Sequence, residues 1–440
     1  MAFSLHGVRV PHRKNTADKP ALRLDPPKTV TLPMSMHIGA PAKIVVKVGD
    51  LVKVGTLIAE AGGAVSAPIH ASVSGKVTKI IDCLLANGNT VPAVVIESDG
   101  EMTPDEILTP PEVTSRETLI EAIKNAGIVG LGGAGFPTHF KQNADPDKLE
   151  YLIINGAECE PYVTSDSYTM VNRSDDMARG LEAMKTYMGI KKVVIGVENN
   201  KKKAIEAMKS LAADTSSNCS VELKVLPSIY PQGGEKVLIY HTTGKVVPVG
   251  KLPIDVGCMV MNCTTLAAIG SYLKTGMPLV KKCVTVDGGA VKDPQNVIVP
   301  IGTAMTDVFE ACGGFTEEPE KVIYGGPMMG VSVPDVSAPI LKNTNAILAL
   351  TAKEINRPKD TACIRCGSCT NSCPFGLNPA DIARAYQKRD AAALKDLSLM
   401  ACMECGCCSF VCPAHRPLVQ TNKLAKAFLK EEEAKEENHA

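Results

Sequence analysis

Two hydrophobic patterns divide the first half of the chain. Between residues 37 and 97, short runs rich in Val and Ile are separated by Gly-containing turns at 48–50 and 62–63. Short β-branched runs bounded by such turns predict a small β domain. Residues 99–115 are rich in Pro, Thr and acidic side chains, a composition typical of a linker.

After this linker, apolar runs and helical spacings alternate. A helix is expected over residues 116–126, with Thr114 and Glu117 spaced as a capping box. Strand–helix–strand–helix–strand order predicts a parallel sheet, whose ligands bind beyond the carboxyl ends of the strands. The expected strands are Tyr151–Asn155, Val193–Val197 and Val221–Leu226, and the helix between the first two buries Met177, Leu181, Met184 and Met188.

Composition narrows the class of protein. Lys and Arg together number 47, as do Asp and Glu, so the chain lacks the basic character expected of nucleic-acid-binding proteins. Residues Val256–Leu273 carry no charge, but Gly, Asn, Thr and Ser interrupt them, so no membrane span is expected. The N-terminus has no apolar signal sequence, and clustered cysteines in a chain that is not secreted favour metal binding over disulfides.

Two cysteine runs of identical spacing are the strongest chemical signal. Each reads C-x2-C-x2-C-x3-C-P, the spacing of ferredoxins with two [4Fe–4S] clusters. The fourth cysteine of each run is expected to bind the cluster of the other run. Zinc sites are the alternative, but they use Cys pairs separated by a longer gap. The expected ligands are Cys363, Cys366, Cys369 and Cys412 for one cluster, and Cys402, Cys405, Cys408 and Cys373 for the other, with Cys407 as a packing residue.

A glycine-rich loop follows the helix expected at 116–126. Glycines allow backbone N–H groups to approach a phosphate closely, and Lys141 would add a positive charge. The loop is not a Walker A motif, because no Gly-Lys-Ser/Thr is present. A purely structural turn is the alternative. The glycines concerned are Gly130, Gly132, Gly133 and Gly135.

Two polar segments directly follow the first and third expected strands. The first contains Asn155, Glu158 and Glu160, and the second contains Gly233 and Glu235. Both should therefore lie on the ligand side of the sheet. For Glu235, the alternative to a ligand contact is a helix-capping role, because acidic residues are common at helix starts.

Several segments in this order resemble a known family. GLGGAGFPTHFK and NGAECEP are similar to the flavin site of the NADH-binding flavoprotein subunit of respiratory complex I. Together with MSMHIGAPAKIVVKVGD, the segment YPQGGEKVLIYHTTGKVVPVGKLPIDVG and the two cysteine runs, they resemble the C subunits of Rnf ion-translocating electron-transport complexes. The segments span nearly the whole chain, which makes the resemblance more specific than any one motif.

The resemblance implies the cofactors FMN and NAD(H) and a set of site residues. Phe136, Glu160 and Glu235 would face the nicotinamide nucleotide, with Glu160 and Glu235 as the catalytic residues. The residues expected to contact the cofactors are Gly130, Gly132, Gly133, Gly135, Phe136, Lys141, Asn155, Glu158, Gly233, Asn262 and Thr265.

The expected fold is a multidomain α/β architecture. It comprises a barrel-sandwich-hybrid (lipoyl-like) β domain within 1–98, a Rossmann-like parallel α/β domain that binds FMN and NADH over 112–250, and a small β-grasp-like (SLBB) module over 251–345. A helical ferredoxin-like domain with two [4Fe–4S] clusters follows over 350–425, and a charged tail over 426–440. The hairpin tip of the β domain lacks the Lys of a swinging-arm carrier, so a scaffold role is expected.

The expected function follows from the cofactors. NADH donates two electrons as hydride and a cubane accepts one, so a flavin must stand between them. The family implies a peripheral subunit of a membrane-bound ferredoxin:NAD⁺ oxidoreductase on the cytoplasmic face of the bacterial cell membrane, attached through partner subunits. Two other interpretations stay open: a diaphorase subunit of a cytosolic flavin-based enzyme or hydrogenase, and a non-catalytic electron-wiring protein.

Overall fold

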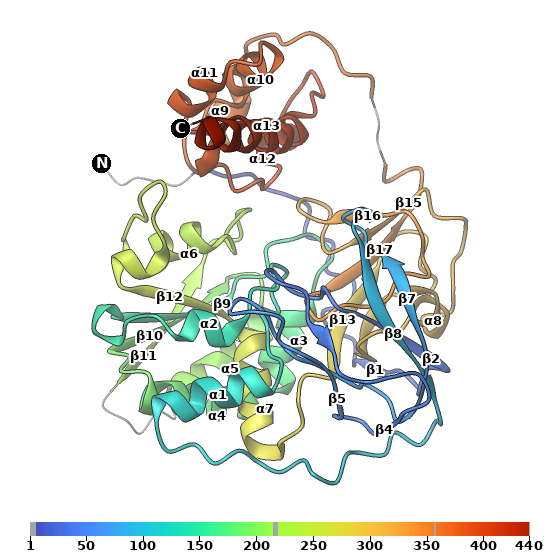
Figure 1. Cartoon of the computed structure of the whole chain (residues 1–440). Coiled ribbons are helices and arrows are strands. Elements are labelled where there is room, and N and C mark those ends of the chain that lie inside the picture. Colours follow the sequence, from blue (N-terminus) through green and yellow to red (C-terminus); the bar gives the residue numbers. More distant parts are fainter. Residues whose placement is uncertain (1–5, 214–218, 356–357, 440) are drawn as a thin grey trace.

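The computed structural model describes residues 6–213, 219–355 and 358–439. Helices α9–α13 form a separate domain above a larger body that contains all the sheets (Figure 1). The larger body holds four sheets: two in the N-terminal β domain, one parallel sheet and one six-stranded mixed sheet. The multidomain α/β architecture expected from the sequence is confirmed.

The N-terminal β domain consists of two small antiparallel sheets that face each other. Val30, Leu32, Ile58, Val77 and Ile96 fill the space between them and are all buried. Two short facing sheets are what the alternating β-branched runs predict. One sheet has the order β2 (Thr29–Pro33), β8 (Thr90–Ser98), β7 (Gly75–Leu84) and β4 (Leu51–Val52), and the other the order β3 (Lys43–Ile44), β5 (Leu57–Glu60) and β6 (Ile69–His70).

The central domain is built on a four-stranded parallel sheet of order β11-β10-β9-β12. Alternate residues of β9 face opposite sides, so that Leu152 and Ile154 pack with the helices of one face and Ile153 packs with α6 on the other. The strands are β9 (Tyr151–Gly156), β10 (Lys192–Glu198), β11 (Ser220–Leu226) and β12 (Cys258–Asn262). The helices are α1 (Arg116–Asn125), α2 (Thr138–Gln142), α3 (Ser165–Asn172), α4 (Ser174–Tyr187), α5 (Lys202–Ala213), α6 (Glu235–Thr243) and α7 (Cys263–Thr275).

The parallel sheet extends beyond residue 250, where the sequence placed a domain boundary. Strand β12 pairs in parallel with β9, and α7 packs against α4, so residues 258–275 complete the central domain rather than the module after it. The apolar run 258–261 offered no sign of its partner strand, because strand pairing is set by tertiary contacts. The capping box of α1 is also one residue later than predicted, between Ser115 and Thr118.

The six-stranded sheet contains strands from distant parts of the chain. Its order is β1-β14-β13-β17-β15-β16, so β1, near the N-terminus, and β17, beyond residue 345, both belong to it. The predicted boundaries 1–98 and 251–345 therefore miss one edge strand and one central strand. The elements are β1 (Leu22–Arg23), β13 (Lys281–Asp287), β14 (Gln295–Pro300), β15 (Lys321–Tyr324), β16 (Val331–Val333), β17 (Ala346–Leu350) and α8 (Met305–Ala311).

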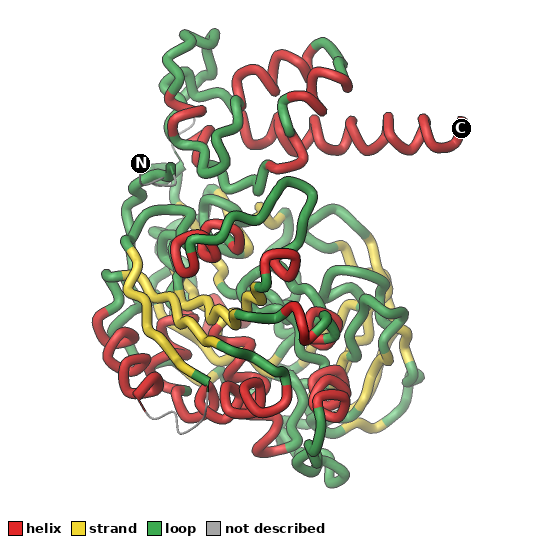
Figure 2. The backbone as a smooth tube through the Cα atoms, turned by 90° about the vertical axis from the view of Figure 1, so that its left-hand side faces the viewer, coloured by secondary structure: helices red, strands yellow, loops and turns green. Residues whose placement is uncertain are grey.

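The C-terminal domain is helical, and α13 is its longest element. Ile382, Leu394, Leu399, Ala425 and Leu429 form its core, and the end of α13 projects beyond the other helices (Figure 2). Its helices are α9 (Ser368–Asn371), α10 (Pro379–Gln387), α11 (Ala391–Asp396), α12 (Cys407–Phe410) and α13 (Leu418–His439). Among the described residues, we find no helix that combines the length and apolar character needed to cross a membrane.

Candidate flavin and iron–sulfur sites

The glycine-rich loop runs from the end of α1 to the start of α2. Val129 and Pro137 form an isolated β-bridge, and the Gly130 N–H donates to Phe136 O at 2.8 Å, which closes the loop at its base. Gly133 and Gly135 have φ values of +118° and +69°, a backbone region that residues with side chains rarely adopt. The glycines at these two positions therefore shape the tip of the loop.

Three consecutive backbone N–H groups at the loop tip remain available. Those of Gly132, Gly133 and Ala134 have no hydrogen-bond acceptor within the described part of the chain. A run of unpaired N–H groups in a glycine turn fits an anionic phosphate. The loop therefore has the donors that the phosphate of FMN requires.

The loop lies against the carboxyl ends of β9 and β12. Asn262 caps α7 by accepting from the N–H groups of Thr264 and Thr265, and the Leu131 N–H donates to Thr265 Oγ1 at 2.9 Å. A Cβ atom at Gly132 would come within 3.0 Å of Asn262 Nδ2, so the absence of a side chain permits this approach. The fold thus brings together Gly132, Asn262 and Thr265, three of the residues expected to contact the cofactors.

A second polar contact closes the same edge of the sheet. Asn155 Nδ2 donates to Gly233 O at 2.9 Å, and Asn155 Oδ1 accepts from the Ala157 N–H at 3.1 Å. A Cβ at Gly233 would lie 2.3 Å from Ala157 O, so only glycine fits at this position. Asn155 therefore connects the end of β9 to the loop that precedes α6.

Lys141 and Glu235 form an ion pair that connects α2 to α6 near the same edge of the sheet. Lys141 Nζ on α2 lies 2.6 Å from Glu235 Oε1 at the first residue of α6, and both side chains are partly exposed. The N-cap of α6 is Gly234, and Glu235 is the acidic residue of its first turn, where a negative charge also suits the helix dipole. Phe136 packs edge-on against Phe140 on the same side, with ring centroids 5.9 Å apart.

The carboxylates of Glu158 and Glu160 are directed into the protein. Glu158 accepts from the Asp166 N–H at 2.7 Å and from the Ser167 hydroxyl at 2.7 Å, at the N-terminus of α3. Glu160 accepts from the N–H groups of Met328 and Met329 at 3.0 and 2.9 Å. Burial raises the pKa of Glu158, and it raises the pKa of Glu160 to about 7. Among the described residues, no hydrogen bond or ion pair connects either carboxylate to Lys141 or Glu235.

Lys14 has a structural role that no motif indicated. Its ammonium group is buried and donates to the backbone carbonyls of Glu158, Glu160 and Val163 at 2.9, 2.7 and 2.5 Å. Burial lowers the pKa of Lys14 to about 8, and the Glu158 carboxylate opposes that shift. The N-terminal segment thereby holds the turn after β9 in place, through contacts 144 to 149 residues apart in sequence.

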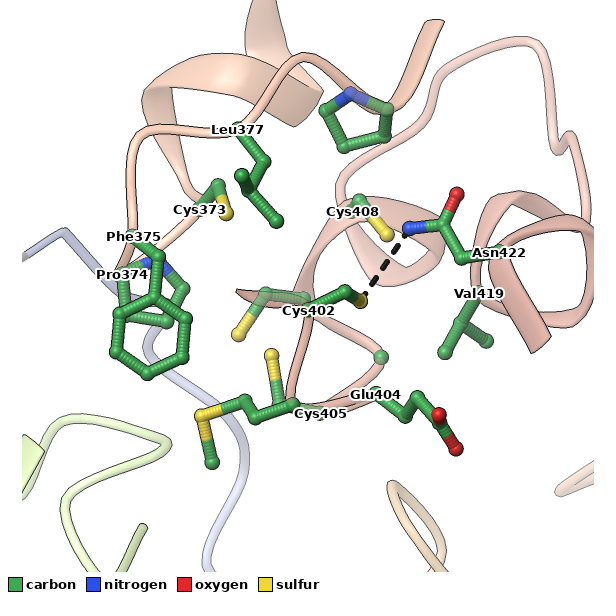
Figure 3. Close-up of a pocket in the computed structure, with 14 residues that line it drawn as sticks. Cys373, Pro374, Phe375, Leu377, Cys402, Glu404, Cys405, Cys408, Val419 and Asn422 are labelled. Atoms are coloured by element: carbon green, nitrogen blue, oxygen red, sulfur yellow. Dashed lines mark hydrogen bonds between the residues drawn. The ribbon is translucent and has the colours of Figure 1, made fainter. Parts of the chain in front are cut away.

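Eight cysteines of the two runs divide between two cavities. One cavity is lined by Cys402, Cys405 and Cys408 together with Cys373 from the first run (Figure 3). The other is lined by Cys363, Cys366 and Cys369 together with Cys412 from the second run. Four thiols around one cavity fit a cubane, in which each cysteine binds a separate iron.

The surroundings of the two cavities differ. Asn422 Nδ2 donates to Cys402 Sγ at 3.4 Å in the first, and Arg365, Arg384 and Arg416 line the second. Within the described residues, no group of three or more His, Cys, Asp or Glu side chains is arranged for a single metal ion. Cys407 also lines the first cavity, but its thiol faces Tyr230 O at 3.9 Å and packs in a small apolar cluster with Val8 and Val10.

Close contacts connect the lining of the first cavity to the loop that follows β11 of the parallel sheet. The Tyr230 hydroxyl donates to Cys405 O at 2.7 Å, and a Cβ at Gly234 would lie 2.4 Å from Met403 Cε. Tyr230 belongs to the same loop as Gly233 and Glu235. The loop that completes the candidate flavin site is therefore also the loop on which the cysteine segment 402–408 rests, a role for Tyr230 that sequence reasoning missed.

Four domain families match consecutive parts of the chain. The RnfC barrel sandwich hybrid domain matches residues 3–101 and the Nuo51 FMN-binding domain matches 123–271. The SLBB domain matches 283–332 and the 4Fe-4S dicluster domain matches 355–413. The FMN-binding match contains the glycine-rich loop, β9 and β12, and the dicluster match contains both cysteine runs. These matches support FMN and [4Fe–4S] clusters as the cofactors of the two sites.

Curated relatives match over most of their length. The C subunit of the proton-translocating ferredoxin:NAD(+) oxidoreductase complex of Clostridium ljungdahlii is 44% identical over 86% of this chain and 82% of its own. The C subunit of the Na(+)-translocating ferredoxin:NAD(+) oxidoreductase complex of Acetobacterium woodii is 43% identical over 96% and 95%. The C subunit of the ion-translocating oxidoreductase complex of Rhodobacter capsulatus is 40% identical over 99% and 85%.

Among solved structures, an NAD+-reducing [NiFe]-hydrogenase in the H2-reduced state shows a weaker likeness. Its TM-score is 0.49 at 19% identity, over 72% of this chain and 61% of that one. This likeness is too low to support an argument about the fold.

Proposed function

Because the chain belongs to the family of C subunits of ion-translocating ferredoxin:NAD(+) oxidoreductase complexes, we propose that it exchanges hydride with NAD(H) and passes single electrons to partner subunits. The junction between Tyr230 and Cys405 is the observation that carries this proposal. It connects a nucleotide-type site to a four-cysteine cavity within one chain, as an oxidoreductase that converts between hydride and single electrons requires.

FMN, when bound, supplies the conversion between a two-electron hydride and single electrons. The N–H groups of Gly132, Gly133 and Ala134 would hold its phosphate, and Lys141 would add a charge-assisted contact. Gly130 and Gly135 shape this loop, and Asn262 and Thr265 hold it against the sheet. Asn155 holds the neighbouring loop that contains Gly233. These contacts make the phosphate end of the site rigid before the cofactor binds.

Phe136 and Glu235 would orient the nicotinamide nucleotide at the mouth of the site. Both are partly exposed there, and the Glu235 carboxylate is held by Lys141 at 2.6 Å. Glu158 and Glu160 act as positioning residues in this proposal, because their carboxylates hold α3 and the loop at 328–329. Glu160 thus supports the site without touching the nucleotide, which modifies the catalytic role first expected for it.

The two cysteine cavities would each hold one [4Fe–4S] cluster with crossed ligands. The cavity of Cys402, Cys405, Cys408 and Cys373 adjoins the flavin-site loop. The other contains Cys363 and Cys366, which are exposed. We therefore place the first cavity between the flavin site and the second cavity, and assign the exposed one to electron exchange with partner subunits.

Partner subunits would also supply the attachment to the membrane. The relatives are named as subunits of ion-translocating complexes with ferredoxin and NAD(+) as reactants. We assign the chain to the cytoplasmic face of the bacterial cell membrane, where both reactants are found. Extraction from membranes by salt or mild detergent, with the other subunits retained, tests this assignment.

Anaerobic purification followed by counts of iron, sulfide and flavin on one sample tests the cofactor content. The proposal expects about eight irons, as two clusters of four, with stoichiometric FMN. Iron and sulfide without any flavin would favour a protein that only conducts electrons.

A further inference from the structure

Two lysines, one on the six-stranded sheet and one just before its strand β17, donate hydrogen bonds to the glycine-rich loop segment. Lys282 on β13 donates from Nζ to Leu131 O at 2.8 Å. Lys342, just before β17, donates to Gly127 O at 2.7 Å and to Pro68 O of the N-terminal β domain at 2.6 Å. Each lysine therefore donates to one backbone carbonyl of the loop segment, at Leu131 and Gly127.

Both ammonium groups are deeply buried, and among the described residues neither forms an ion pair, although the Asp166 carboxylate favours the charged form of Lys282. Lys282 is 4% exposed and Lys342 is 1% exposed, and no ion pair to either is recorded within residues 6–213, 219–355 and 358–439. Burying an unpaired ammonium group is unfavourable unless hydrogen bonds compensate for the lost water. Burial accordingly lowers the pKa of each lysine to about 7. Two buried lysines that bind carbonyls of one loop segment are unfavourable to bury, which suggests that the shape of this loop matters for function.

Two further donors bind carbonyl groups of the loop. Asn343 Nδ2 donates to Gly133 O at 2.9 Å, and the Ile38 N–H donates to Gly135 O at 3.0 Å. Carbonyl groups at positions 127, 131, 133 and 135 are thus all satisfied by the two neighbouring domains. At the loop tip, the unpaired N–H groups of residues 132–134 therefore remain available to a ligand.

We propose that Lys282 and Lys342 are positioning residues for the flavin phosphate. By binding carbonyl oxygens of the glycine-rich loop, they keep the unpaired N–H groups of residues 132–134 directed toward the anion. This inference rests on the proposed function. It makes flavin affinity a joint property of three domains, since the loop, its lysines and Pro68 belong to different ones.

Comparison of FMN with riboflavin tests the inference, because riboflavin lacks the phosphate. Lys282→Met and Lys342→Met keep the apolar stem and remove the ammonium group. For each flavin-depleted variant, we expect FMN affinity to fall by at least about tenfold, because the N–H groups of the loop would no longer be held in place for charge-assisted bonds to the phosphate. Riboflavin affinity should stay within about twofold of wild type. Lys185→Met is the matched control, because Lys185 is also buried but pairs with Glu182 on α4.

Two results would overturn the inference. Unchanged FMN affinity in both lysine variants would show that the loop keeps its shape without them, and a parallel loss of FMN and riboflavin would show a general collapse of the site. If the lysine variants do not fold, Asn343→Ala decides, because its side chain is not buried; it should weaken FMN alone, and equal effects on both flavins would contradict the inference. Wild-type protein that binds no FMN would instead refute the proposed function itself.

Discussion

Lys141 Nζ lies 2.6 Å from Glu235 Oε1, and this ion pair joins two charged residues that were expected to have separate tasks. Lys141 was expected to bind the flavin phosphate and Glu235 to orient the nucleotide. Because each side chain positions the other, a substitution at either one should disturb both tasks, but to different degrees. The two variants below separate these contributions.

Lys141→Ala should lower FMN affinity by about one to two orders of magnitude, because a charge-assisted contact contributes about 1.5–3 kcal/mol. Flavin retained after gel filtration, divided by iron content, measures the effect. Lys148→Ala is the control, since Lys148 is a nearby exposed lysine whose ion pair is with Asp145. Equal flavin content in both variants would remove Lys141 from the site.

Glu235→Gln should retain FMN and both clusters while NADH oxidation drops at least tenfold. Hydride transfer requires close alignment, and a displacement of about 1 Å can cost about 100-fold. Turnover per bound flavin, with the melting temperature of the same sample, is the measurement. Glu117→Gln changes another first-turn acid and should leave turnover unaltered. Normal turnover with a lowered melting temperature in Glu235→Gln would instead assign the residue a purely structural role.

Cys373→Ser should impair the cluster bound by the second cysteine run, because Cys373 lines the cavity of Cys402, Cys405 and Cys408. Iron content should approach about four per chain, and the remaining paramagnetic signal should be that of the other cluster. Cys407→Ser is the matched control, because its thiol faces Tyr230 O, and it should keep both clusters. Loss of the cluster bound by Cys363, Cys366 and Cys369 would contradict the crossed arrangement.

His70 should make folding stability sensitive to acid. Its ring is buried, and Nδ1 has no hydrogen-bond partner among the described residues. Burial, with a smaller contribution from Lys342, lowers the pKa of His70 from 6.5 to about 3. Between these values the unfolded chain binds a proton that the folded chain does not, so stability falls as pH falls. The free energy of unfolding should decline more steeply in wild type than in His70→Gln, by up to about 1.4 kcal/mol per pH unit below pH 6. Anaerobic denaturant titrations at pH 5, 6 and 7 measure this, and equal slopes would show that His70 is charged in the folded state.

The parts of the fold that the sequence predicted are those encoded by local periodicity. Met177, Leu181 and Met184 recur at helical spacing and are buried on α4, and the three expected strands each lie within one residue of their observed bounds. The order of the domains was likewise readable from motifs. The multidomain architecture and the family could therefore be predicted from the sequence alone.

What the sequence did not predict depends on contacts between distant segments. Strand β1 joins a sheet more than 250 residues away, and Lys14 and Lys282 reach carbonyls of other domains. A buried lysine that donates to backbone carbonyls has no sequence signature, because its partners carry no distinctive side chain. The same is true of Tyr230, whose hydroxyl meets a backbone carbonyl of the cysteine domain.

The central claim is that hydride enters at the glycine-loop site and leaves as single electrons through the cysteine domain of the same chain. An anaerobic titration of the purified protein with NADH, followed at the flavin absorbance with flavin and iron counted on the same sample, tests it most directly. The account predicts that NADH bleaches the bound flavin stoichiometrically and that a one-electron acceptor restores the oxidised spectrum. Protein that contains both clusters and flavin but does not respond to NADH would contradict it.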